Sequence, residues 1–401
     1  MLLICEVPMM KSKDKVKLLI IGQTPPPYVG QMIMIENLVK AQYRDLRVFH
    51  TRMNYSQTTA QIGKVRIRKL FHLLRVIVES SYKIVRHRID VVYYPPGADT
   101  VPILRDIATL LVLRCFRRKL ILAFHASGLC QRVSSWRGFP RWLFRKAFFF
   151  PDAAIQKSSL NPPDGEFIKA RRVYIVPNGC PDQFERFRQP GPLNFAPVIL
   201  FVGLITEEKG VEVLIEAARL LRRAGRKFRV EFLGEFTSDR YRQKLLRELK
   251  VKGLEQCVAF CGRKVDDEKW AHYRAADIFC FPTHYSAESF GNVLLEAMMF
   301  ELPVVSTAWR GVSGIVEEGV TGFLTEIKNP AEVAARLERL LADEKLRISM
   351  GRKGRERYLE KFTLKTCLDQ TSAVVLEVAN HRNESRGRKN SAVRSVTSEA
   401  R

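Results

Sequence analysis

Short apolar segments alternate with helical stretches along most of this 401-residue chain, and the alternation occurs twice. Strands that alternate with helices form a parallel sheet with helices on both faces. A chain of this length, 46% hydrophobic, also exceeds one ordinary core. We therefore predict an α/β protein with two doubly wound, Rossmann-like domains. The predicted strands are 16–22, 46–50, 90–94, 119–124, 153–156 and 173–176 in the first half, and 198–203, 228–234, 257–260, 277–282 and 303–306 in the second.

A segment rich in proline and glycine separates the two halves. Residues 177–197 contain five prolines and two glycines, a composition that interrupts both helices and strands. We place the linker at 186–197, between domains at 16–185 and 198–363. Open α/β sheets bind ligands at the carboxyl ends of their strands, so the two domains should face each other across one cleft. The predicted helices are 64–88, 103–117, 210–224, 238–252, 331–359 and 364–380.

The ends of the chain differ from its body. Residues 381–401 have few large apolar side chains and six Lys and Arg against two Asp and Glu, so we predict a disordered basic tail. The apolar run at the start is too short for a membrane span, and six charged residues interrupt 101–122, so no transmembrane helix is predicted. The eight cysteines lack zinc-site spacing, and we expect reduced cytosolic thiols.

The net charge of +25 is concentrated in the first half, where residues 1–190 contain 32 Lys and Arg against 13 Asp and Glu. Such a half suits an acidic partner, which could be an anionic lipid, a phosphorylated substrate or nucleic acid, although solubility alone would also explain it. Residues 64–90 and 136–150 mix basic with aromatic and aliphatic side chains, which suits an anionic membrane interface or an amphipathic core helix. No nucleic-acid-binding motif is present, so we expect no nucleic-acid partner.

The segment HYSAESFGNVLLEAMMFELPVV at 284–305 places Glu288 in a loop after a predicted strand, and Glu296 inside a largely apolar helix. The helix should begin near Gly291, with Ser289 as a candidate cap. The amides of Gly291, Asn292 and Val293 would then form an anion site. Two carboxylates on either side of an anion site match a sugar nucleotide, which has hydroxyls, a diphosphate and further hydroxyls in that order. On spacing alone, a dipole-complementing Glu288 and a solvated Glu296 would fit equally well.

The block at 281–324 resembles the most recognisable block of the retaining glycosyltransferases of family 4, which have the GT-B fold. The hallmark of that block is a pair of glutamates separated by seven residues, here Glu288 and Glu296. Four further blocks are similar to segments of the same family: FVGLITEEKGVEVLIEA (201–217), VPNGCPDQF (176–184), IGQTPPPYVGQM (21–32) and ILAFHAS (121–127). The resemblance covers roughly 16–380. It implies a hexosyltransferase of polysaccharide biosynthesis, with an acceptor-side first domain, a donor-binding second domain, and a C-terminal helix at 364–380 packing back on the first.

The resemblance also implies a role for each matching residue. Glu288 would bind donor-sugar hydroxyls and Glu296 ribose hydroxyls, while His125 would face the donor sugar near the reacting carbon. The remaining donor-binding residues are Lys209 with the amides of Gly291, Asn292 and Val293 on the diphosphate, Gly203 ending the phosphate-binding strand, Gly30 allowing close backbone approach, and Arg263 near the base. The acceptor would be a saccharide or a lipid-linked saccharide. The location would be cytoplasmic or on the inner face of the cell membrane, in contact with anionic lipid.

Two positions depart from the family pattern. Leu204 stands where an arginine on the diphosphate is frequent, and Gly314 replaces a usual acidic residue. No Asp-x-Asp motif is present, so we expect no metal and no other cofactor, with Lys209 and helix amides stabilising the leaving diphosphate. A nicotinamide-dependent dehydrogenase is disfavoured because no Gly-x-Gly-x-x-Gly follows the first strand. A sugar-nucleotide epimerase, a phosphorylase or a non-catalytic sugar-nucleotide-binding homologue remains an alternative.

Overall fold

The computed structural model describes residues 15–26, 30–53, 67–187 and 196–396, without the side chains of 67–69 and 381–396. It contains two separate six-stranded parallel sheets, each built from one half of the chain. The predicted pair of doubly wound domains is therefore confirmed. The first sheet has the order β2-β1-β3-β4-β5-β6 and consists of β1 (Val16–Gly22), β2 (Leu46–Arg52), β3 (Val91–Tyr94), β4 (Lys119–Ala123), β5 (Ala153–Gln156) and β6 (Val173–Ile175).

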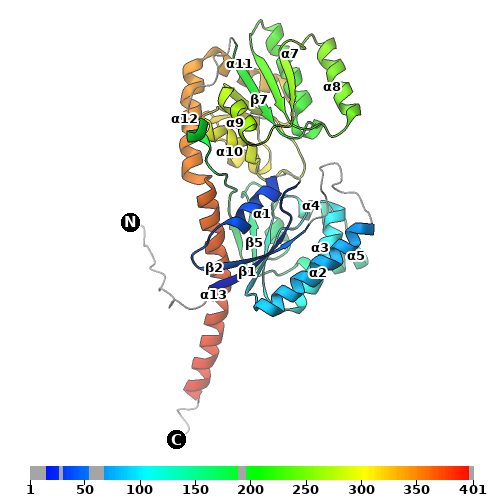
Figure 1. Ribbon diagram of the computed structural model, residues 1–401, viewed down its shortest axis with the longest axis vertical. Helices are drawn as coiled ribbons and strands as arrows, with labels where there is room; N and C mark the ends of the chain where they lie inside the picture. Colours follow the sequence, from blue (N-terminus) through cyan, green and yellow to red (C-terminus); the bar gives the residue numbers. More distant parts are fainter. Residues whose placement is uncertain (1–14, 27–29, 54–66, 188–195, 397–401) are drawn as a thin grey trace.

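Helices cover both faces of the first sheet (Figure 1). One face packs against α2, α3 and α5, whose buried side chains join a single apolar cluster with the strands. The other face packs against α1 and the long C-terminal helix. The helices of this domain are α1 (Gly30–Lys40), α2 (Ile67–His87), α3 (Thr100–Cys115), α4 (Leu129–Val133), α5 (Gly138–Phe148) and α6 (Asp164–Phe167).

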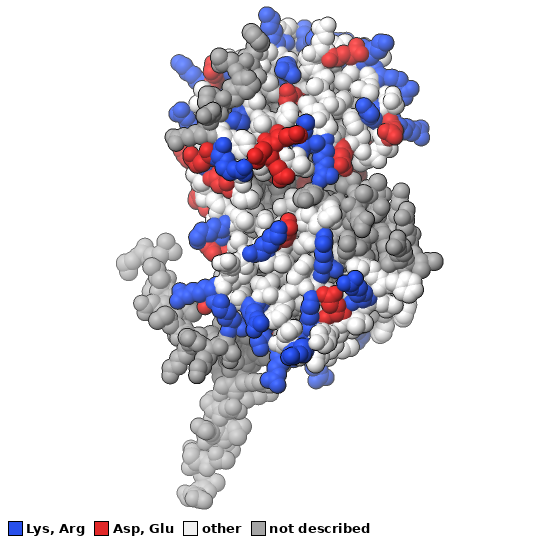
Figure 2. Space-filling model, viewed as in Figure 1, with Lys and Arg blue, Asp and Glu red and all other residues white. Residues whose placement is uncertain are grey.

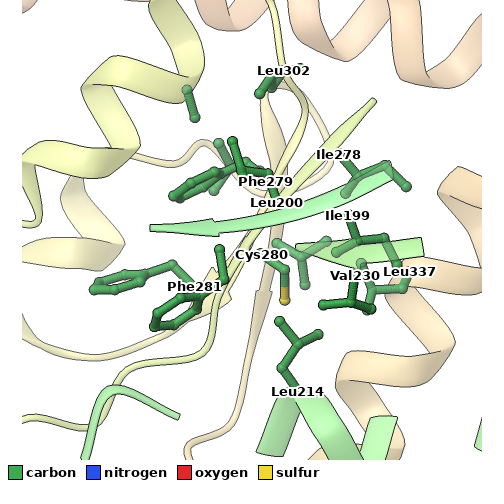
Figure 3. Close-up of a cluster of buried hydrophobic side chains, with 14 of the residues drawn as sticks. Ile199, Leu200, Leu214, Val230, Ile278, Phe279, Cys280, Phe281, Leu302 and Leu337 are labelled. Atoms are coloured by element: carbon green, nitrogen blue, oxygen red, sulfur yellow. The ribbon is translucent and has the colours of Figure 1, made fainter. Parts of the chain in front are cut away.

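The second sheet has the order β12-β11-β10-β7-β8-β9, so the strand order reverses between β7 and β10. Its core joins strand residues such as Ile199, Leu200 and Phe279 to Leu214 and Leu337 from the covering helices (Figure 3). The strands are β7 (Val198–Val202), β8 (Arg229–Leu233), β9 (Val258–Gly262), β10 (Ile278–Phe281), β11 (Val304–Thr307) and β12 (Gly322–Thr325). The helices are α7 (Val211–Arg223), α8 (Asp239–Val251), α9 (Asp266–Ala275), α10 (Asn292–Met299), α11 (Pro330–Ala342) and α12 (Glu344–Lys361).

The C-terminal helix α13 (Leu364–Val396) leaves the second domain and packs on the first sheet. Cys367, Val374, Val375 and Val378 are buried there, and the helix then extends past the first domain (Figure 1). The helix continues beyond 380, where we predicted a disordered tail. No proline, the residue that interrupts a helix most strongly, occurs in 364–396. Residues 397–401 of the predicted tail lie outside the described part.

The chain crosses between the domains twice, and the two crossings lie side by side. The backbone N–H of Cys180 donates to the carbonyl of Phe362, and the N–H of Leu364 donates to the carbonyl of Cys180, at 3.1 and 2.9 Å. A side chain at Gly179 would place its Cβ 2.2 Å from the carbonyl oxygen of Thr363, so only glycine permits this approach. The paired crossings form one two-stranded connection between the domains.

In the described part of the chain, no helix combines the length and apolar character needed to cross a bilayer. The seven cysteines that the structure describes are all free thiols. Two of them, Cys280 and Cys367, are buried.

Candidate active site at the cleft

The loops after β7 and β10 leave the second sheet as neighbours, at the point where the strand order reverses. Open α/β sheets bind ligands at such a switch point. A 3₁₀ turn, η3 (Glu207–Lys209), begins at Thr206, whose hydroxyl accepts the Lys209 N–H at 3.3 Å. Gly210 follows with φ +81°, and a Cβ there would lie 2.0 Å from the carbonyl oxygen of Pro282. This glycine therefore allows the Lys209 loop to lie directly against the end of β10.

Lys209 and Glu288 form an ion pair across these two loops, with the Lys209 Nζ hydrogen-bonded to Glu288 Oε2. Their side chains are 17% and 12% exposed, respectively, so a charge on either would be poorly solvated without the other. The Lys209 ammonium also lies 4.6 Å from the centre of the Tyr285 ring. The site thus offers one cation and one carboxylate at the end of a sheet, which can hold a phosphate and a hydroxyl.

Helix α10 begins beside this pair. Gly291 is its N-cap, with φ +86° and no side-chain cap, and Asn292 is the first helical residue. The expectation that Ser289 caps the helix is wrong, because its hydroxyl donates across the cleft to the His125 carbonyl oxygen at 2.5 Å. Asn292 accepts a 2.8 Å hydrogen bond from Asn178 of the crossing segment. A Cβ on Gly30, the first residue of α1, would lie 3.1 Å from Asn292 Nδ2, so the two helix starts approach closely.

Glu296 lies in the second turn of α10 and has two partners that the sequence analysis missed. Lys269 donates to one carboxylate oxygen at 2.8 Å and the Tyr273 hydroxyl donates to the other at 2.7 Å. Both partners come from α9, and Tyr273 is fully buried. Burial raises the pKa of Tyr273 well above its usual value, and the neighbouring carboxylate adds to this. Lys269 and Tyr273 thus supply the hydrogen bonds that a carboxylate in these apolar surroundings requires.

His125 follows β4 of the first domain and is 7% exposed. Its Nε2 is hydrogen-bonded to the Tyr93 hydroxyl at 2.9 Å. Its Nδ1 is buried and has no hydrogen-bond partner within the described ranges. Burial, and secondarily the charge of Lys157, lower the pKa of His125 well below 6.5. The imidazole is therefore neutral near pH 7.

A hydrogen-bond network across the cleft holds the Glu288 loop against the His125 loop. The Ser127 hydroxyl donates to the carbonyl of Glu288 at 2.8 Å. Arg310 of η4 (Arg310–Gly314) reaches from the second domain to Ser127 Oγ at 3.0 Å and to Gln131 Oε1 at 2.7 Å. Arg310 has φ +48°, a conformation that a non-glycine residue adopts only when its surroundings hold it. Arg310, Ser127 and Gln131 were not predicted from the sequence, because they meet only through the tertiary fold and form no local pattern.

A second bridge in this network runs through Asn161. Its side-chain amide donates to the Ser289 carbonyl at 2.8 Å, and its Oδ1 accepts the Gly311 N–H at 2.9 Å. The two bridges and the Ser289 bond hold the loops of His125, Glu288 and Lys209 together where the two domains meet.

The remaining predicted residues lie around the ends of the second sheet. Gly203 directly follows β7, and its N–H donates to Leu233 at 2.9 Å. Arg263 follows β9 and pairs with Glu235 at 3.2 Å. Val293 is in the first turn of α10. Gly314 packs against the first domain, where a Cβ would be 3.0 Å from Ser158 Oγ.

One group of potential metal ligands occurs within the described ranges. Glu231, Cys261 and His272 have ligand atoms within 4.8 Å of one another. None of them is a predicted site residue, and Glu231 is engaged by Arg229 at 3.4 Å and by His272 Nδ1 at 2.8 Å.

Residues 182–357 match the sequence family described as Glycosyl transferases group 1. The matched residues include most of the second domain. An uncharacterized glycosyltransferase of Methanocaldococcus jannaschii is 26% identical over 363 residues, which cover 88% of this chain and 96% of the relative. The capsular polysaccharide biosynthesis glycosyltransferase CapM of Staphylococcus aureus is 32% identical over 248 residues, 58% of this chain and 64% of CapM.

The crystal structure of Anabaena HepE in complex with UDP superimposes with a TM-score of 0.68 over 90% of this chain and 100% of HepE, at 18% identity. A sucrose-phosphate synthase from Thermosynechococcus elongatus gives a TM-score of 0.67 over 91% of this chain and 99% of that structure, at 17% identity. These likenesses confirm the predicted GT-B fold. The family match and the named relatives also confirm that the protein is a glycosyltransferase.

Proposed function

We propose that this glycosyltransferase is a retaining, metal-independent hexosyltransferase of family 4. It moves a sugar from a nucleoside-diphosphate sugar to a glycan or lipid-linked acceptor in cell-surface polysaccharide biosynthesis. The observation that carries the proposal is the ion pair of Lys209 and Glu288 at the switch point of the second sheet, held against His125 of the first domain. CapM, by its name, acts in capsular polysaccharide biosynthesis, and HepE is named as a complex with UDP, which supports the donor and pathway classes.

The proposed roles follow from charge and place. Lys209 and the amides of Gly291, Asn292 and Val293 hold the diphosphate, which displaces the Lys209 ammonium from Glu288. Glu288 then accepts hydrogen bonds from donor-sugar hydroxyls. Glu296 binds the ribose hydroxyls while Lys269 and Tyr273 fix its orientation. Gly203 and Gly30 allow backbone approach, and Arg263 lies on the base side.

His125 serves as a neutral hydrogen-bonding group toward the donor sugar, because burial keeps its imidazole uncharged. Positive charge develops on the sugar ring in an oxocarbenium-like transition state, and a neutral imidazole does not oppose it. The leaving diphosphate oxygen takes the proton of the acceptor hydroxyl, while the acceptor oxygen bonds to the anomeric carbon on the face that the diphosphate leaves. The anomeric configuration is thereby retained. Lys209 and the helix amides stabilise the negative charge on the diphosphate.

Product analysis tests the reaction class. The purified protein is incubated with a panel of sugar nucleotides and saccharide acceptors, with and without EDTA. We expect release of a nucleoside diphosphate coupled to a longer glycan whose new bond keeps the donor's configuration by NMR, and no effect of EDTA. A sugar 1-phosphate product would indicate a phosphorylase, an altered sugar nucleotide would indicate an epimerase, and binding without turnover would indicate a non-catalytic homologue.

Lys209→Ala tests the proposed phosphate contact. The variant should lose much more affinity for a nucleoside diphosphate than for the nucleoside, by calorimetry, since Leu204 supplies no second cation on that loop. Lys227→Ala, an exposed lysine of the same domain, is the matched control. Equal loss for both ligands would remove Lys209 from the diphosphate.

We also propose that the enzyme is cytoplasmic and works at the inner face of the cell membrane. The basic first domain supports this placement, because a lipid-linked acceptor and anionic headgroups would both lie at that surface.

A further inference from the structure

Helix α2 has an apolar outer stripe that nothing in the described chain covers. Its inward stripe includes Val76 and Ile84, which are 1% and 0% exposed in the core of the first domain. A helix at the surface of a soluble domain normally carries polar residues on its outward face. The outward face of α2 instead has one large exposed apolar or aromatic side chain in each turn: Phe71 (70%), Leu74 (53%), Val78 (66%), Tyr82 (62%) and Val85 (63%).

Exposed apolar side chains also occur on the neighbouring helices of the same layer. Helix α3 packs between α2 and α5, and the three lie side by side in Figure 1. Leu104 of α3 is 53% exposed, and Phe139 and Trp142 of α5 are 67% and 53% exposed. The rings of Phe139 and Trp142 stack with their centres 5.8 Å apart. We call the outer surface of these helices the α2–α3–α5 face. Its apolar groups come from three elements, so they are more than scattered single exposures.

Basic residues surround these apolar groups. Residues 67–150 contain 16 Lys and Arg against four Asp and Glu, and α5 has no acidic residue. Arg141, Arg145 and Lys146 are exposed on α5, and the Lys146 ammonium lies 5.9 Å from the centre of the Trp142 ring. A groove of about 530 Å³ opens there between α3 and α5, lined by Arg114, Gly138, Arg141, Trp142, Arg145, Lys146, Phe149 and Phe150. In Figure 2 most of the charged side chains visible on the first domain are blue, whereas the second domain shows both signs.

We infer that the α2–α3–α5 face docks on a bilayer containing anionic phospholipid. The apolar stripe enters the boundary between headgroups and acyl chains, as an amphipathic helix does, and the arginines around the groove bind phosphate headgroups. Charge decides against a second copy of this chain as the occupant, because a symmetric contact through this face would place the basic residues of both copies together.

The inference rests on the proposed function only for the purpose of docking, which would be to hold the active site near a membrane-borne acceptor. Binding to lipid can be measured without donor or acceptor. Binding of a nucleoside diphosphate, measured in parallel, reports on the cleft alone. A failure of the docking surface can therefore be distinguished from a failure of the proposed reaction.

The experiment is co-sedimentation of the full chain with vesicles of phosphatidylcholine alone and of phosphatidylcholine mixed equally with phosphatidylglycerol. We expect binding to the anionic vesicles only, weakening with added salt because headgroup attraction is screened. The combined variant Arg141→Gln, Arg145→Gln and Lys146→Gln should reduce the partition coefficient by at least about tenfold. The combined variant Phe71→Ser, Val78→Ser and Tyr82→Ser should reduce it as much, but with the remaining binding still sensitive to salt.

Matched triple variants in the second domain serve as controls. Arg222→Gln, Arg223→Gln and Lys227→Gln change three exposed basic residues, and Val251→Ser, Val265→Ser and Ile348→Ser change three exposed apolar ones. Both controls should bind vesicles like the wild type, and all variants should keep their affinity for a nucleoside diphosphate.

The inference is overturned if the wild type does not bind anionic vesicles, or if both α2–α3–α5 variants bind like their controls. It is also overturned if sedimentation shows a dimer that the apolar variant converts to a monomer without change in vesicle binding. In that case a second copy is the partner.

Discussion

Glu288 is held both through its side chain and through its backbone. It is nearly buried, and among the described residues its ion-pair partner is Lys209, from a loop 79 residues away in the chain. Its carbonyl oxygen is simultaneously fixed by Ser127 of the other domain. A donor phosphate that attracts Lys209 would release the Glu288 carboxylate beside the sugar. The pair would thus keep the carboxylate compensated until a ligand arrives.

Glu288→Gln is therefore expected to reduce kcat by roughly a hundred- to a thousand-fold, because a neutral amide cannot stabilise developing charge on the donor sugar. Affinity for the nucleoside diphosphate should be largely kept, since Lys209, Glu296 and the α10 amides are unchanged. Steady-state kinetics and calorimetry measure the two quantities. The matched control is Glu255→Gln, which changes an exposed carboxylate of the same domain. A Glu288→Gln enzyme with the wild-type rate would end the assignment.

His125 should make stability dependent on pH. Its pKa is lower in the folded chain than the value near 6.5 of an unfolded histidine, so below pH 6.5 the unfolded state binds more protons. The free energy of unfolding should thus fall as pH drops below 6.5, by up to about 1.4 kcal/mol per pH unit from this residue. Urea unfolding of wild type and His125→Gln at pH 7 and 5.5 measures the difference. The histidines at 50, 72 and 284 have lowered pKa values in both proteins, so equal pH dependence would contradict the prediction.

At the residue scale, spacing in the sequence located the two glutamates and the family resemblance located Lys209, but neither located their partners. Tyr273 and Lys269 contact Glu296 because α9 packs beside α10, a tertiary relation that no local pattern encodes. The Ser289 cap was a reasonable local expectation, yet the serine faces His125 because the two domains are closed together.

Helix α13 is the element with the largest structural consequence, since it belongs to the second domain by sequence and to the first by packing. It covers one face of the first sheet with residues that are almost completely buried. Without α13, apolar side chains of the central strands β1, β3 and β4 would be exposed to water on that face, which is unfavourable in proportion to the exposed area.

Val375→Ala tests this packing. Val375 is 0% exposed, so the substitution should lower the free energy of unfolding by roughly 1–3 kcal/mol through lost burial and a residual cavity. Val251→Ala makes the same chemical change at a residue that is 87% exposed and should have almost no effect. Chemical denaturation of both variants gives the comparison, and equal stabilities would show that α13 does not depend on this contact.

Element prediction succeeded where periodicity was strong and failed where tertiary context decides. The strands of both sheets were found, except β12, whose four residues follow a turn and show no alternation of their own. The single helix expected at 331–359 is two helices, because Asp343 ends α11 and its side chain caps α12 by accepting the Leu346 N–H at 2.9 Å.

At the scale of the molecule, the contact between the two domains depends on hydrogen bonds between single residues. Arg310 donates to two residues of the first domain from a backbone conformation that favours glycine, so its side-chain contacts must offset that strain. Its loss should let the domains separate without changing the donor loops.

Arg310→Gly is thus expected to lower kcat by roughly ten- to a hundred-fold through misplacement of His125 relative to Glu288. The donor KM should stay nearly constant, because Lys209 and Glu296 are untouched. Arg310→Lys can reach only one of the two acceptors and should fall between. Steady-state kinetics with the donor varied provides the test. A rise in KM at constant kcat would place Arg310 in donor binding instead.

The return of α13 to the first sheet also has a consequence during synthesis. Domains generally fold from the N-terminus as the chain leaves the ribosome. The first sheet is complete once β6 has emerged, but the helix that covers one of its faces is encoded almost 190 residues later. Throughout translation of the second domain, the growing chain would therefore expose that apolar face. The first domain reaches its final stability only after the second has been synthesised. The domain that is translated first is therefore the last to be completed.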